Sequence, residues 1–166
     1  FSYRGHGQSD GNPFGFTYGA AESEDVDAAV AYLQRRGATR IAAMGHSAGA
    51  AATLLSAARN PAIDAIVAVA PFNSVRDVWH TGRPSFVPAF VLDSALWMAE
   101  QRKGFRQEDV FPLQVVDQIA PRPVLILHGT QDQHITTAQA EALYEAARAP
   151  KALWLVEGAT HAEMRT

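Results

Sequence analysis

The segment that decides the fold is Ile41-Ala42-Ala43-Met44-Gly45-His46-Ser47-Ala48-Gly49, followed by an alanine-rich run to residue 58. Its pattern is typical of a short apolar strand, a Gly-x-Ser-x-Gly turn and a helix. A serine at such a turn is exposed at the carboxyl end of its strand, on a strained backbone. Glycine suits both flanking positions, because a side chain there would meet neighbouring elements. The segment therefore predicts an exposed Ser47, with the Ala48 amide as a donor to an oxyanion. The alternative is a glycine-rich turn in which the Ser47 hydroxyl caps the helix.

Composition places the chain among globular proteins of about one domain. It has 166 residues, of which 48% are hydrophobic and 19% charged. A net charge of −3 gives no basic field, which argues against a nucleic-acid partner. No cysteine is present, so disulfides and thiolate metal sites are excluded. No apolar run has the length of a membrane span. The chain opens on Phe1 without methionine or a visible signal peptide, and we expect it to be a segment of a longer protein.

Apolar strands alternate with amphipathic helices along most of the chain. We expect helices over residues 21–36, 48–58 and 136–148, and strands over 39–44, 63–70, 124–127 and 152–156. The strand at 63–70 is nearly continuous in apolar residues, as in a parallel strand covered on both faces. The pattern predicts one α/β domain over residues 1–166, a three-layer α/β/α arrangement with a mostly parallel sheet.

Residues 72–121 interrupt this alternation. The stretch contains Pro84, Pro88 and Pro112 in its interior, and six aromatic residues occur from Trp79 to Phe111. We expect short helices near 90–102 and 114–119 and interpret the stretch as a cap-like insertion that roofs a pocket. The alternative, which we weigh equally, is that the aromatic residues pack on the main core.

Three local patterns have ordinary structural interpretations. The glycine-rich loop at residues 4–11 has neither the third glycine nor the lysine of a nucleotide-binding loop, so we expect a turn. The acidic run at 22–25 is expected to be a solvated first helical turn rather than a metal site. Thr136 and Gln139 match a capping box.

Ser47, Asp132 and His161 each follow a different predicted strand. Carboxyl ends of parallel strands meet at one edge of a sheet, where ligand sites gather. A serine hydroxyl needs an imidazole to take its proton, and the imidazole needs a carboxylate that fixes its tautomer.

The other histidines are weaker candidates for the base. His46 precedes the serine and should point away from it. We expect His128 to be packed and hydrogen-bonded and His134 to lie at the pocket rim. No two histidines have metal-ligand spacing with an acidic partner, so no metal site is expected.

Four ordered motifs resemble the α/β-hydrolase superfamily. Arg4-Gly5-His6-Gly7 with Ser9 resembles the loop after its fourth strand, and Gly45–Gly49 resembles its nucleophile elbow. His128–Asp132 resembles its acid loop and Gly158–His161 its histidine loop. The chain order Ser, Asp, His is also that of this superfamily. The serine aminopeptidase-like and prolyl-oligopeptidase-like hydrolases are the most similar branch.

The resemblance implies a serine hydrolase without a cofactor, acting on a small-molecule acyl substrate through an acyl-enzyme. It implies Ser47 as nucleophile, His161 as base and Asp132 as the orienting acid. Ala48 and His46 are assigned to the oxyanion or substrate site. A carboxylesterase is the first expectation. The alternatives are a serine peptidase or thioesterase of the same fold, or a non-catalytic hydrolase-like fragment acting as a binding module.

The chain also departs from the superfamily pattern. Members usually have eight strands, and the motifs here begin at the fourth. The second oxyanion donor normally comes from the loop after the third strand, which has no counterpart here. The strand at Ile41 would then have an unpaired edge, which invites aggregation or pairing. We therefore expect this segment to be less stable and less active than a version extended at its amino end; equal ester turnover would refute this.

Overall fold

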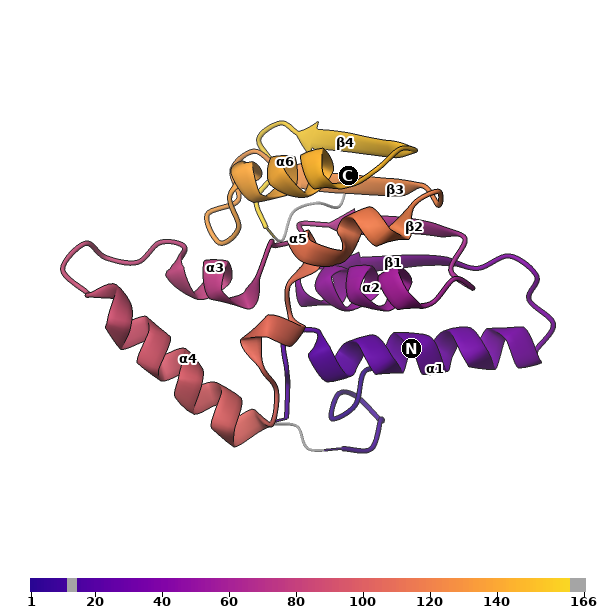
Figure 1. Ribbon diagram of the computed structural model, residues 1–166, viewed down its shortest axis with the longest axis horizontal. Helices are drawn as coiled ribbons and strands as arrows, with labels where there is room; N and C mark the ends of the chain where they lie inside the picture. Colours follow the sequence, from indigo (N-terminus) through magenta and orange to yellow (C-terminus); the bar gives the residue numbers. More distant parts are fainter. Residues whose placement is uncertain (12–14, 162–166) are drawn as a thin grey trace.

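A computed structural model describes residues 1–11 and 15–161. Its sheet has four strands in the order β1 (Ala42–His46), β2 (Ala65–Val69), β3 (Val124–Gly129) and β4 (Lys151–Val156). Every neighbouring pair is parallel, with Met44 opposite Val67 and Val67 opposite Leu125. All four carboxyl ends therefore lie at one edge (Figure 1).

The helices that connect these strands are α1 (Ala20–Arg35), α2 (Ala48–Arg59) and α6 (Thr137–Ala146). Figure 1 shows α2 and α6 in front of the sheet, with α1 beside α2. The last of these helices ends two residues earlier than predicted: Ala147 is already extended, and Pro150 close behind disfavours helix in the residue before it.

The main core lies between these helices and one face of the sheet. Ile66 of β2 and Ile126 of β3 are buried there against Val30, Leu54 and Leu143 of the three helices. This confirms the predicted α/β class with a parallel sheet. On the opposite face, Met44 is 72% and Trp154 60% exposed. The described helices thus form the layer over one face only.

Strand β1 lies at the edge of the sheet, because β2 is its only partner among the described strands. This matches the unpaired edge implied by the superfamily strand order. The strand begins and ends later than predicted, at 42–46 instead of 39–44, because Gly45 and His46 pair with Ala68 and Val69. Residues 1–3 are not in a strand, and Tyr3 packs against the main core.

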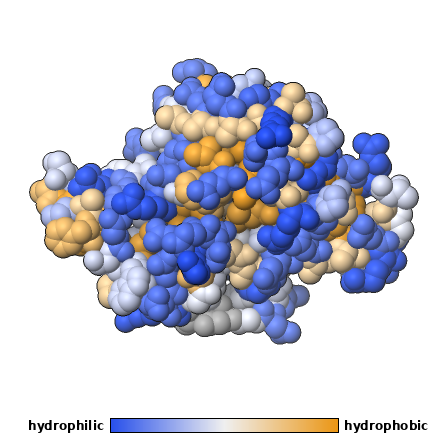
Figure 2. Space-filling model, in the orientation of Figure 1, coloured by the Kyte–Doolittle hydropathy of each residue, from blue (hydrophilic) through white to orange (hydrophobic). Residues whose placement is uncertain are grey.

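The insertion contains α3 (Val75–His80), α4 (Ala89–Lys103), η1 (Gln107–Asp109), α5 (Pro112–Val115) and η2 (Val116–Ile119). Figure 1 shows α3 and α4 projecting beyond the carboxyl edge of the sheet. Its aromatic residues are divided between two environments. Phe72 and Phe105 are buried in a second core, whereas Phe86 is 83% and Trp97 59% exposed. Hydrophobic atoms accordingly gather on the surface near the α3–α4 connection (Figure 2). The predicted roof over a pocket stays a prediction.

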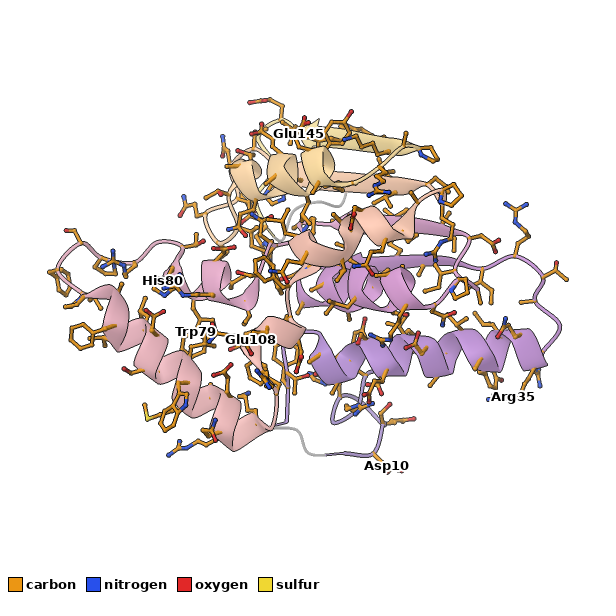
Figure 3. The ribbon with its side chains drawn as sticks, viewed as in Figure 1. Asp10, Arg35, Trp79, His80, Glu108 and Glu145 are labelled. Carbon is orange, nitrogen blue, oxygen red and sulfur yellow. The ribbon has the colours of Figure 1, made fainter. Side chains whose placement is uncertain are left out.

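Hydrogen bonds join elements of the insertion to each other and to α6. His80 of α3 faces α4 (Figure 3), where its Nε2 lies 2.9 Å from Asp93 Oδ1, and Arg76 donates two hydrogen bonds to the same carboxylate. Gln139 of α6 accepts a hydrogen bond from the Asn73 N–H through Oε1. The predicted capping box is wrong: Thr136 caps α6 without a side-chain hydrogen bond, and the Gln139 side chain binds the insertion instead.

The first turn of α1 differs from the prediction of a solvated acidic run. Glu22 is only 1% exposed, and its carboxylate accepts hydrogen bonds from the Thr17 N–H, the Thr17 hydroxyl and the Gly19 N–H. A buried carboxylate is tolerated when donors surround it. Asp25, by contrast, pairs with Arg4 of the glycine-rich loop. The loop is a turn, as expected, although residues 12–14 lie outside the described part.

Candidate active site

Ser47 lies at the sharp turn between β1 and α2. Its backbone has φ 55° and ψ −120°, a left-handed φ that is unusual for a residue with a side chain. Its N–H donates to Val69 O of the neighbouring strand, and no side-chain cap bond forms. The helix-capping alternative for Ser47 is therefore excluded. A Cβ at Gly45 would overlap the backbone oxygen of Gly49, so this turn requires glycine at residue 45.

The turn also positions the Ala48 amide. Ala48 is the first residue of α2, and the N–H groups of a first helical turn have no partner within their helix. The Ala48 N–H and the Ser47 hydroxyl thus lie on the same turn. This is the geometry in which an N–H can stabilise negative charge beside that hydroxyl.

Asp132 is buried in the loop after β3. Its Oδ1 accepts the N–H groups of His134 at 2.8 Å and Ile135 at 2.9 Å, and its Oδ2 faces His161. Burial alone would raise the pKa of Asp132. The N–H of Ile135, the His161 ring and the N–H of His134 outweigh burial and hold the pKa below its ordinary value. The carboxylate is therefore ionised at neutral pH.

His161 joins Asp132 to Ser47. Its Nδ1 lies 2.6 Å from Asp132 Oδ2, and its Nε2 lies 3.1 Å from Ser47 Oγ. Because the carboxylate can only accept, Nδ1 carries the proton and Nε2 accepts from the serine hydroxyl. The structure thus brings together the three residues that the sequence singled out from separate strand ends.

The loops after β3 and β4 approach each other closely. The Gln131 N–H donates to Ala159 O, and the Gly158 N–H donates to the Thr130 hydroxyl. A Cβ at Gly129 would overlap Ala159 O, so this approach requires glycine. These contacts hold the Asp132 and His161 loops in one unit. Sequence reasoning did not find the Thr130 contact, because it depends on the approach of two separate loops.

The other histidines occupy different positions. His128 is fully buried and donates Nε2–H to Ile135 O at 2.8 Å, which confirms the packed, hydrogen-bonded residue that was predicted. The exposed His134 ring lies 5.5 Å from the His161 ring, measured between centroids. The His46 Nε2 lies 2.8 Å from the backbone oxygen of His161, a contact that the sequence did not reveal. The assignment of His46 and Ala48 to an oxyanion or substrate site stays a prediction.

In residues 1–11 and 15–161, no three histidine, cysteine or acidic side chains are grouped so that they could hold a metal ion. The same part of the chain contains no helix with the length and apolarity needed to cross a membrane.

Residues 4–164 match the profile of the prolyl oligopeptidase family. The chain belongs to the prolyl oligopeptidase family. It is also 32% identical over 169 residues to YqkD of Bacillus subtilis strain 168, an uncharacterised protein. That alignment covers 98% of this chain and 54% of YqkD, so the chain spans about half the length of this relative.

Solved structures show the same fold. The Pyrococcus furiosus esterase Pf2001 superposes with a TM-score of 0.74 at 22% identity, covering 98% of this chain and 62% of that one. Est1E of Butyrivibrio proteoclasticus, solved with ferulic acid bound, gives 0.72 at 23%, covering 99% and 68%. The esterase domain of a Rhodothermus marinus protein gives 0.64 at 27%, covering 86% and 60%. The α/β-hydrolase fold expected from the motifs is therefore confirmed.

Proposed function

We propose that this chain carries the catalytic residues of a serine hydrolase that cleaves carboxylic esters. The observation that carries the proposal is the hydrogen-bonded series Ser47–His161–Asp132, with atom separations of 3.1 Å and 2.6 Å. Membership of a hydrolase family and the likeness to esterase structures support it.

In the proposed reaction, His161 Nε2 takes the proton of the Ser47 hydroxyl as Oγ attacks the ester carbonyl. The Ala48 N–H stabilises the oxyanion, and Asp132 stabilises the imidazolium that forms. His161 then gives the proton to the leaving alcohol, and Ser47 keeps the acyl group. A water molecule, deprotonated by His161, releases the acid and restores the serine.

Covalent labelling with a fluorophosphonate probe tests this proposal without knowledge of the substrate. We expect labelling that disappears in Ser47→Ala and persists in the control Ser94→Ala. Ser94 is an exposed serine of α4 whose hydroxyl donates to Phe90 O, outside the site. Absence of labelling in the wild-type protein would favour a non-catalytic binding module.

The second candidate is peptide hydrolysis, which the family description favours. The same three residues serve ester, thioester and peptide substrates, so the site geometry does not separate them. A panel of chromogenic acyl esters of increasing chain length, run beside an aminopeptidase substrate and a thioester, separates them. We expect the esters to be turned over fastest.

A further inference from the structure

The backbone of His161 is held by a second histidine from the opposite edge of the sheet. His46 ends β1 and His161 follows β4, and these strands are the two edges of the sheet. His46 Nε2 lies 2.8 Å from His161 O, and the two rings lie 4.9 Å apart between centroids. The contact joins residues that are 115 positions apart in the chain.

His161 must cross the ends of β2 and β3 to reach Ser47. The loop contacts through Gln131 and Thr130 fix residues 158 and 159 against β3, on the far side of this span. Asp132 holds the His161 ring through Nδ1 but not its backbone. Among the described residues, the hydrogen bond from His46 therefore holds the His161 backbone on the Ser47 side.

The atoms involved define the role of His46. A carbonyl oxygen only accepts, so His46 Nε2 must carry a proton and donate it. That nitrogen is thereby unable to act as a base toward Ser47, whose hydroxyl is already paired with His161. Ser47 follows His46 directly, so the hydrogen bond ties the nucleophile turn to the histidine loop.

We infer that His46 is a positioning residue, whose Nε2–H holds the His161 backbone at the distance that proton transfer from Ser47 requires. The inference rests on the proposed function and adds to it the group that sets the geometry. A displacement of about 1 Å in such an arrangement can cost about 100-fold in rate.

Two substitutions separate the hydrogen bond from the ring. His46→Phe keeps a planar ring beside His161 and removes the donor. His46→Gln removes the ring and keeps a side-chain N–H at similar reach. We expect the labelling rate with a fluorophosphonate to fall about 10- to 100-fold in His46→Phe and to return to within about threefold of wild type in His46→Gln. With an ester substrate, kcat should fall while KM stays within about twofold.

His6→Phe is the matched control. His6 is also exposed, and its Nδ1 lies 3.0 Å from a backbone oxygen, that of Arg4, within its own loop. We expect its labelling rate to stay within about twofold of wild type. Thermal unfolding of each variant reports any loss of fold. A labelling rate restored in His46→Gln would show that the loss in His46→Phe comes from the missing hydrogen bond and not from misfolding.

A second readout does not depend on turnover. The short Nδ1–H···Oδ2 bond between His161 and Asp132 should give a low-field proton resonance, which we expect to broaden or disappear in His46→Phe and to remain in His46→Gln. Wild-type labelling in His46→Phe, or equal losses in both variants, would overturn the inference. If the wild-type protein is not labelled at all, the proposed function fails, and the resonance still decides whether His46 orders His161.

Discussion

Among the described residues, two carboxylate–histidine pairs have similar short separations but different surroundings. His161 Nδ1 lies 2.6 Å from Asp132 at the strand ends, and His80 Nε2 lies 2.9 Å from Asp93 between α3 and α4. The Asp132 side chain is fully buried, whereas the Asp93 side chain is 40% exposed and shared with Arg76. The other ring nitrogen of His161, Nε2, lies 3.1 Å from the hydroxyl of Ser47 on its strained turn.

The difference shows that the pair alone does not define a site. At the strand ends, Asp132 accepts hydrogen bonds from two backbone N–H groups in addition to its contact with the imidazole. These two bonds stabilise its charge and fix its orientation independently of His161. In the insertion, the same two residue types connect two helices at the surface. Exposed ion pairs of this kind contribute little to stability.

The largest difference is expected between Asp132→Asn and Asp93→Asn. An amide at residue 132 removes the charge that stabilises the imidazolium and fixes the His161 tautomer. We expect ester hydrolysis to fall about 10³- to 10⁴-fold in Asp132→Asn and less than about twofold in Asp93→Asn. Initial rates on the best ester of the panel measure both. A similar loss in the two variants would remove the distinction between the pairs.

Apolar packing, rather than the ion pair, is expected to hold the insertion. Leu96 of α4 is 0% exposed in the second core, and its neighbour Trp97 is 59% exposed. Leu96→Ala should cost about 2–5 kcal/mol of unfolding free energy, whereas Trp97→Ala should change it by less than about 0.5 kcal/mol. Urea unfolding measures both. An equal cost at the two positions would mean that the exposed face of α4 is covered in solution.

Glycines in the two regions are expected to be needed for different reasons. A Cβ at Gly129 would overlap the Ala159 backbone, so Gly129→Ala must separate the loops of Asp132 and His161, at about 1–3 kcal/mol. Gly82 follows α3 with φ 70° and open space around it, and Gly82→Ala should cost about 1 kcal/mol. Only the first variant should also lower the labelling rate of Ser47, which a side-by-side labelling time course would show.

Lowering the pH should reduce the unfolding free energy through both carboxylates, and more through Asp132 than through Asp93. Hydrogen bonds from Arg76 and His80 lower the pKa of Asp93, and the donors described above lower that of Asp132. A depressed carboxyl pKa contributes stability above the unfolded value, about 3.9, which is lost as pH falls through the folded pKa. Solvent screens the exposed pair.

Unfolding free energies measured from pH 6 to pH 2.5 would test this. We expect wild type to lose stability below about pH 4 and Asp132→Asn to flatten that loss more than Asp93→Asn does. If Asp93→Asn flattens the loss of unfolding free energy more than Asp132→Asn does, the Asp93 pair contributes more to stability than the Asp132 pair, contrary to this account.

Sequence pattern predicted the parallel sheet and the proximity of Ser47, Asp132 and His161, because strand ends and the serine turn have local signals. The apolar runs at 63–70 and 124–127 indicate buried strands, and the turn at Gly45–Gly49 indicates an exposed serine. The His46 contact with His161, the burial of Glu22 and the use of Gln139 by Asn73 were not predictable. Each of these contacts forms between segments brought together by the folded chain, and local periodicity does not specify the path of the loops involved.

The most direct test of the central claim is peptide mapping of the protein after reaction with a fluorophosphonate. The account predicts a single adduct on the peptide that contains Ser47, formed far more slowly in His161→Ala. An adduct on another serine, or one on Ser47 that forms equally fast without the His161 imidazole, would contradict it.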